Sequence, residues 1–170
     1  MKIDAGNKSA LLNIGYNCLK LGQYEKALDS SRKAMALDPR LKEAVIVYTT
    51  CEALIGDAGN TIPILEDLLK EVPEYPMAVA ILASAYEIEG EREKGLKHIK
   101  YLTKMGFACA DYLHDLSKRL VSTGKTERAI SLLEFAVESG NGTKEIREML
   151  DGLLIGEFDD SMIGEQQMIR

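Results

Sequence analysis

The chain has 170 residues, of which 46% are hydrophobic and 28% are charged, so it is long enough to form a folded protein with an apolar core. Its formal net charge of −6 argues against a duplex nucleic acid as partner, because phosphate binding requires clustered lysine and arginine side chains. No apolar run approaches the roughly 18 residues that a membrane-spanning helix needs, and residues 1–7 do not resemble a signal peptide.

Four pairs of helix-like stretches follow one another along the chain, and a glycine stands between the two stretches of each pair. The pairs span residues 8–41, 42–75, 76–109 and 110–143, and the glycines, Gly22, Gly56, Gly90 and Gly124, recur every 34 residues. A glycine in the left-handed conformation can end the first helix of each pair. A fixed period of this length predicts a stack of helical hairpins.

The positions around these glycines follow the same period. Small residues stand seven positions before each glycine (Gly15, Thr49, Ala83, Ser117) and five positions after it (Ala27, Thr61, Gly95, Ala129). Large apolar or aromatic residues stand eight positions before it (Ile14, Tyr48, Leu82, Leu116). Small residues let two helix backbones approach where they cross, and large ones fill the space beside the crossing. The pattern therefore predicts tight packing within and between the pairs.

The chain continues beyond the fourth pair with one more predicted helix. Thr143 is a suitable N-cap, and the apolar spacing over 144–155 predicts an amphipathic helix. Earlier in the chain, Pro63 is expected in the first turn of a helix, where its missing N–H costs little. Residues 156–170 mix acidic and apolar side chains without a period and predict a flexible tail, with Phe158, Met162 and Ile163 as an alternative short anchor for a groove.

The first pair resembles a tetratricopeptide repeat. It carries, in the order of that family's pattern, Leu11, Ile14, Gly15, Gly22, Tyr24, Ala27, Ala34 and Pro39. The resemblance implies an all-α, right-handed superhelical solenoid of about four full helix-turn-helix repeats with a C-terminal capping helix at 144–155. The proline that ends each unit is present at Pro39 and Pro73 and is replaced by Phe107 and Asn141, so the third and fourth units are degenerate repeats.

Residues 1–7 align with the end of a second helix in this frame. They are interpreted as the end of a truncated preceding repeat, which predicts that the chain is a fragment of a larger protein. A first unit without its preceding helix would expose an apolar face at its N-terminal side and favour self-association.

The three cysteines, Cys18, Cys51 and Cys109, form no CxxC pair and have no neighbouring histidine, so they are interpreted as buried free thiols. Free thiols are typical of a reducing compartment, which favours a cytoplasmic location.

Motifs that could carry catalysis fail in their context. Gly124-Lys125-Thr126 resembles the end of a phosphate-binding loop, but Arg119 occupies the position of the required first glycine. The histidines lie in different units, and acidic runs such as 87–93 are interpreted as solvated faces. The sequence therefore predicts neither an enzyme nor a metal or cofactor site.

The resemblance also implies a concave groove lined mainly by the first helix of each unit. The family's groove positions correspond to Leu12, Asn13, Tyr16, Ile46, Thr50, Ala80, Ser84, His114 and Lys118. Tyr16, Thr50, Ser84, His114 and Lys118 are expected to be exposed, whereas Leu12 and Ile46 could equally pack between helices. Of the family's Lys and Asn clamp for carboxylate termini only Asn13 is present, so the groove suits an extended or helical segment with aliphatic anchors.

The sequence leaves two functions open. The first is a protein-interaction module, an adaptor or scaffold that binds a peptide or a partner helix, with basic character in the partner favoured by the acidic surface. The second is an accessory array that positions substrates for a larger enzyme, such as a glycosyltransferase or methyltransferase, or for secretion machinery.

Overall fold

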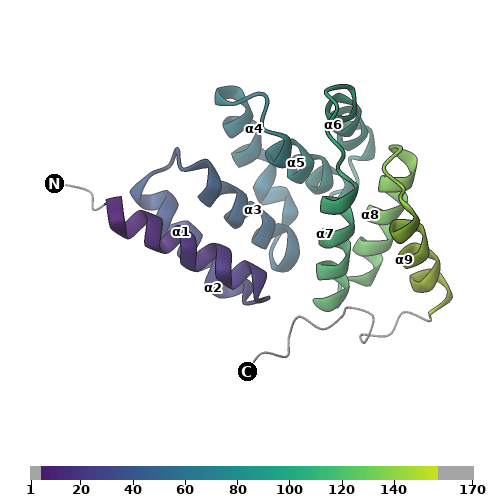
Figure 1. The fold of residues 1–170 in the computed structure, drawn as a ribbon, viewed down its shortest axis with the longest axis horizontal. Coiled ribbons are helices and arrows are strands. Elements are labelled where there is room, and N and C mark those ends of the chain that lie inside the picture. Colours follow the sequence, from purple (N-terminus) through teal and green to yellow (C-terminus); the bar gives the residue numbers. More distant parts are fainter. Residues whose placement is uncertain (1–4, 157–170) are drawn as a thin grey trace. The chain divides into compact units, whose positions relative to one another are not determined.

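The structure is a computed structural model, and it describes residues 5–156 (Figure 1). Within these residues the chain forms nine α-helices and one short 3-10 helix. In chain order they are α1 (Ala5–Lys20), α2 (Tyr24–Leu37), α3 (Lys42–Ile55), η1 (Ala58–Asn60), α4 (Thr61–Glu71), α5 (Pro76–Ile88), α6 (Arg92–Lys104), α7 (Ala110–Ser122), α8 (Thr126–Glu138) and α9 (Lys144–Ile155). The predicted all-α fold of consecutive helix pairs is confirmed.

The chain divides into two compact units, residues 1–82 and 83–170, and the boundary falls within α5. In the first unit α1 packs against α2, and α2 packs against α3. The core there includes Ala27, Val47 and Cys51, with Leu12 and Cys18 of α1 packed against them. Gly15 lies at the crossing: a Cβ added to it would lie 3.5 Å from the carbonyl oxygen of Ala27 and 3.5 Å from Cγ1 of Val47. The predicted close approach of helices at this small residue is therefore observed.

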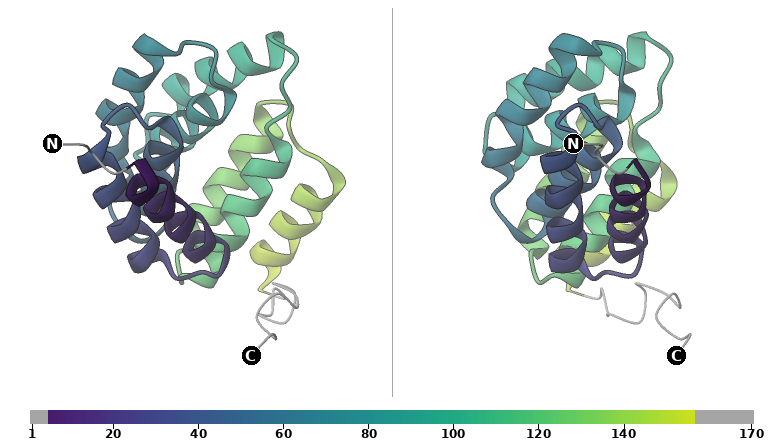
Figure 2. Two further views of the ribbon diagram at one scale, coloured as in Figure 1. Left: turned by 60° about the vertical axis from the view of Figure 1, so that its left-hand side comes forward. Right: turned by 90° about the vertical axis from the view of Figure 1, so that its left-hand side faces the viewer.

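In the second unit α7 packs against α8, and α8 packs against α9, as the three views of the ribbon agree (Figures 1 and 2). The largest fully buried side chain is Phe135 of α8. Its ring lies 3.2 Å from the position that a Cβ on Gly95 would occupy, and the carbonyl oxygen of Ala83 lies 2.8 Å from the same position. Because no side chain fits there, Gly95 allows α5, α6 and α8 to meet.

Three of the four periodic glycines end their helices in the same way. Gly22, Gly90 and Gly124 have positive φ angles of 71°, 79° and 76°. Beside Gly90, the next amide, Glu91 N–H, donates to Tyr86 O at 2.7 Å, while the glycine amide itself donates to Glu87 O at 3.0 Å. This pair of bonds is the Schellman arrangement, which satisfies carbonyls that would otherwise lack partners.

Gly56 does not follow this pattern, so the prediction of a left-handed glycine is wrong there. Its φ and ψ angles are −102° and −138°, and η1 follows before α4 begins. The connection is held instead by Asp57, whose Oδ1 accepts a hydrogen bond of 2.9 Å from Gly59 N–H. A short aspartate turn can replace the glycine cap because it satisfies the backbone locally.

The loss of proline from the third and fourth units has a physical reason. The amide of Phe107 donates to Leu102 O at 3.0 Å, and the amide of Asn141 donates to Ala136 O at 2.8 Å. The preceding residues, Gly106 and Gly140, have φ angles of 82° and 83°. These helices therefore end with Schellman bonds that need an N–H at the position where proline, which has none, stands in the family pattern.

The helix predicted over 144–155 is α9, and Thr143 Oγ1 accepts from Ile146 N–H at 3.4 Å. Pro63 is the third residue of α4, in its first turn as expected. Residues 5–7, the end of the segment interpreted as a preceding repeat, belong to α1. Residues 1–4 and the anchor residues Phe158, Met162 and Ile163 lie outside the described part of the chain.

Candidate functional site

The groove positions of the first unit lie on α1 and α3, and at Ala80 on α5. Asn13 and Tyr16 are exposed on α1, and the Tyr16 side chain is 49% exposed. The ammonium group of Lys20, one turn further along, lies 4.6 Å from the centre of the Tyr16 ring. Such a contact between a cation and an aromatic face is attractive. Leu12 and Ile46 are half-buried, so each contributes to the core and to the surface.

Three of the predicted groove residues are not available at the surface. Thr50 is 8% exposed, Ala80 is 4% exposed and Ser84 is fully buried. The expectation that Thr50 and Ser84 are exposed is therefore wrong. The buried hydroxyl of Thr49, next to Thr50, donates to Val45 O at 2.8 Å, which shows how a polar side chain on these helices is satisfied by its own backbone.

The groove positions of the second unit lie on α7, and at the buried Ser84 on α5. His114 and Lys118 are half-buried, and Asp111 and Asp115 are exposed beside them. Burial and the nearby Lys118 charge lower the pKa of His114, which favours its neutral imidazole. Asp115 pairs with Arg119 at 2.8 Å. This face is polar and mixed in charge, in contrast to the Tyr16 face of the first unit.

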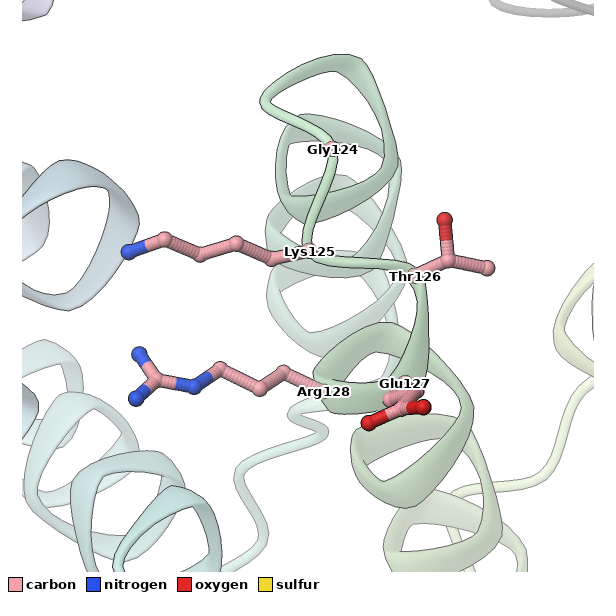
Figure 3. A pocket seen from close by; sticks show the side chains of 5 residues that line it. All are labelled: Gly124, Lys125, Thr126, Glu127 and Arg128. Atoms are coloured by element: carbon pink, nitrogen blue, oxygen red, sulfur yellow. The ribbon is translucent and has the colours of Figure 1, made fainter.

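The Gly124-Lys125-Thr126 turn lies between α7 and α8 and lines a surface hollow of about 310 Å³ together with Glu127 and Arg128. Figure 3 shows that the Lys125 and Arg128 side chains extend to the same side of the turn, whereas Thr126 points away from them. Burial and the Arg128 charge lower the pKa of Lys125. Because the turn joins two helices, it lacks the strand that precedes a phosphate-binding loop.

Sequence reasoning missed a buried carboxylate in the second unit. Glu87 was interpreted as part of a solvated face, but its side chain is 2% exposed. Its Oε1 accepts from Ser131 Oγ at 2.6 Å and from Arg92 Nη1 at 2.8 Å, and Arg92 Nε donates to Glu138 at 2.7 Å. Burial raises the pKa of Glu87, while the Ser131 hydrogen bond and Arg92 oppose that rise. The alternation of acids over 87–93 gave no signal that one of them faces α8.

The described residues also include three cysteines and two histidines. Cys51 and Cys109 are buried, as predicted, whereas Cys18 is only half-buried, and within these residues none of the three is in a disulfide. His98 stacks on Tyr86 with a centroid distance of 5.7 Å. In the same residues, no group of three or more His, Cys, Asp or Glu side chains is placed to hold a metal ion. No helix in the described part of the chain has both the length and the apolar character to cross a membrane.

These features define the class: a helical-repeat protein whose described residues are arranged as consecutive helix pairs. Comparison with known proteins specifies the family. Residues 9–41 match the tetratricopeptide repeat family. The chain is also 25% identical over 159 residues to the TPR repeat-containing protein YpiA of Bacillus subtilis (strain 168). That match covers 88% of this chain and 36% of the relative, so the chain spans about a third of the relative's length.

Residues 9–41 of this chain are a tetratricopeptide repeat, and the consecutive helix pairs that follow are consistent with an array of such repeats. Repeats of this family generally mediate contacts between proteins, and the family is typically non-catalytic.

Proposed function

We propose that the chain is a protein-interaction module that binds a peptide or helical segment of a partner. The observation that carries this proposal is the surface of the first unit at α1, where Tyr16 is half-exposed beside exposed Asn13. An exposed tyrosine supplies a large apolar contact together with a hydroxyl, and such residues carry much of the binding free energy in protein interfaces.

The chemistry of the partner follows from the residues around Tyr16. Half-buried Leu12 and Ile46 offer aliphatic surface, and Asn13 offers hydrogen bonds to a backbone. A segment with aliphatic anchors at helical spacing suits this surface. Because Thr50 and Ala80 are buried, we propose that the contact of the first unit lies on α1 and the exposed edge of α3, where Glu43 lies. Glu43 would favour a basic residue in the partner.

His114 and Lys118 remain a second candidate contact in the other unit, since both are partly accessible on α7. The role of accessory array for a larger enzyme stays an alternative prediction. In either role the chain would act by binding, so the same surface is tested first.

The test compares two variants of α1 as baits in affinity capture from native extract. Tyr16→Ala removes the proposed anchor. Ile14→Ala is the matched control, because Ile14 is also 49% exposed on α1 but lies about 160° around the helix from Tyr16. We expect a partner that the parent chain and the control retain and that Tyr16→Ala loses, with circular dichroism showing that all three are folded. Equal retention by all three chains, or loss by Ile14→Ala instead, would exclude the Tyr16 surface.

A further inference from the structure

The outward face of α6 carries three lysines that the fold does not use. Lys97, Lys100 and Lys104 recur three and four residues apart, which places them in one stripe along the helix. All three are exposed, and within residues 5–156 none of them forms an ion pair. In a chain with a formal net charge of −6, such a stripe is a local concentration of positive charge.

Large apolar side chains lie beside this stripe. Tyr101 is 42% exposed, Met105 is 44% exposed and Phe107 is 44% exposed. Phe107 is held in place at the end of α6, because its N–H donates to Leu102 O at 3.0 Å and Gly106 before it has a φ angle of 82°. We call these six residues, Lys97, Lys100, Tyr101, Lys104, Met105 and Phe107, the α6 surface.

The chemistry that fits the α6 surface is an acidic segment with apolar anchors. Exposed aromatic and methionine side chains favour apolar contacts, and unpaired lysines favour carboxylates. The chain itself contains such a segment at residues 157–163, with the sequence Glu-Phe-Asp-Asp-Ser-Met-Ile. Its three carboxylates match the three lysines in number, and its three apolar residues match Tyr101, Met105 and Phe107.

The geometry of α9 favours binding between copies of the chain over binding within one copy. Asn141, shortly before α9, accepts a hydrogen bond of 3.1 Å from Cys109 N–H, so α9 begins close to the end of the α6 surface. The 12 residues of α9 then carry the chain about 18 Å along the helix axis. The acids of residues 157–160 follow within about 13 Å of that end, which is too short for them to return to Phe107. A second copy has no such restriction.

We propose that residues 157–163 of a second copy of this chain bind the α6 surface. The contact joins two different surfaces, so it can form reciprocally in a dimer or repeat from copy to copy. It is separate from the Tyr16 surface and requires no third protein.

Sedimentation velocity of the full chain tests this proposal. We expect the average sedimentation coefficient to rise with concentration from about 1 to about 200 μM, and the association constant to fall at least about tenfold when salt is raised, because exposed charges are screened. One variant, Lys97→Glu with Lys100→Glu and Lys104→Glu, and a second, Asp159→Lys with Asp160→Lys, should each weaken association about tenfold or more. Mixing the two variants should restore association. The unchanged acids of the lysine variant can then bind the unchanged lysines of the aspartate variant.

The control is Lys26→Glu, a charge reversal of an exposed lysine on α2, which should associate like the parent chain. If the two variants associate only when they are mixed, unfolding cannot explain why each fails to associate alone. A contact through Ile14 is excluded as well, because the charge reversals would leave that contact intact in each variant. The proposal is overturned if the parent chain is monomeric throughout, if either reversed variant associates normally, or if the mixture stays monomeric. Binding of the parent chain to phosphatidylserine vesicles, lost in the lysine variant, without self-association would identify an anionic lipid surface as the occupant instead.

Discussion

The hydroxyl of Ser131 in α8 donates a hydrogen bond of 2.6 Å to Oε1 of Glu87 in α5, and that carboxylate is 98% removed from solvent with Arg92 as its ion-pair partner. Through Arg92, which pairs with this carboxylate, three helices of the second unit, α5, α6 and α8, are joined by polar groups. The Arg92 side chain is 33% exposed and forms ion pairs with both Glu87 and Glu138. Its guanidinium lies 6.0 Å from the centre of the Phe135 ring. Glu87 is costly to bury unless these partners are present.

Arg92→Leu should therefore destabilise the fold. We expect a loss of about 2–3 kcal/mol in the free energy of unfolding, below the largest values for buried pairs because Arg92 is partly exposed. The double variant Glu87→Leu with Arg92→Leu should recover much of this loss, since it removes the unpaired buried charge. Urea unfolding followed by circular dichroism measures both. A double variant no more stable than Arg92→Leu alone would show that the charge of Glu87 is not the cause.

The pH dependence of stability should report the same carboxylate. Burial holds the pKa of Glu87 above its ordinary value of 4.5, so the folded chain binds this proton more tightly than the unfolded chain. The charge of Glu87 therefore lowers stability above the folded pKa, and this cost disappears as pH falls toward 4.5. Glu87→Gln keeps an acceptor for Ser131 and should be most favourable relative to the parent at pH 7, with the difference shrinking toward pH 5. A difference that is constant over this range would mean that Glu87 does not titrate as the structure indicates.

Much of the fold follows from the sequence because the repeat period is carried by local rules. Gly22, Gly90 and Gly124 end their helices with positive φ angles, and small Gly15 lies at a helix crossing. These features depend on backbone geometry near each residue, which the residue type largely determines. At Gly56 the prediction of a left-handed glycine is wrong, because a turn held by the Asp57 side chain follows the helix instead.

The candidate site was less predictable because accessibility depends on what packs against a residue. Thr50 and Ser84 stand at groove positions and are polar, yet both are buried, while Ile14 is apolar and 49% exposed. The sequence pattern identifies a helix face but not the side chains that cover it. Glu87 was misassigned for the same reason, since its partner Ser131 lies 44 residues away in the chain.

Replacing Asn141 by the proline of the family pattern should destabilise the fold. Asn141→Pro would restore the unit-ending proline, but it removes the Asn141 N–H that donates to Ala136 O and the Oδ1 that accepts from Cys109 N–H at 3.1 Å. Because Asn141 is only 8% exposed, water cannot readily replace these bonds, and we expect a loss of about 2–3 kcal/mol in thermal or urea unfolding. Asn141→Asp keeps the acceptor and is the matched control, with a smaller expected loss. An Asn141→Pro chain as stable as the parent would show that these two hydrogen bonds do not contribute to the stability of the fold.

Two glycines in helices should respond in opposite ways to the same substitution. At Gly95 of α6 a Cβ would lie 2.8 Å from Ala83 O and 3.2 Å from two carbons of the Phe135 ring, so Gly95→Ala forces backbone or core movement. We expect a destabilisation of about 1–3 kcal/mol. At Gly15 of α1 the nearest atoms would lie 3.5 Å away, which is ordinary contact, so Gly15→Ala should stabilise by up to about 1 kcal/mol through helix propensity. Urea unfolding of both variants measures the two effects side by side, and equal responses would mean that the packing of α6 against α5 and α8 is looser than the structure shows.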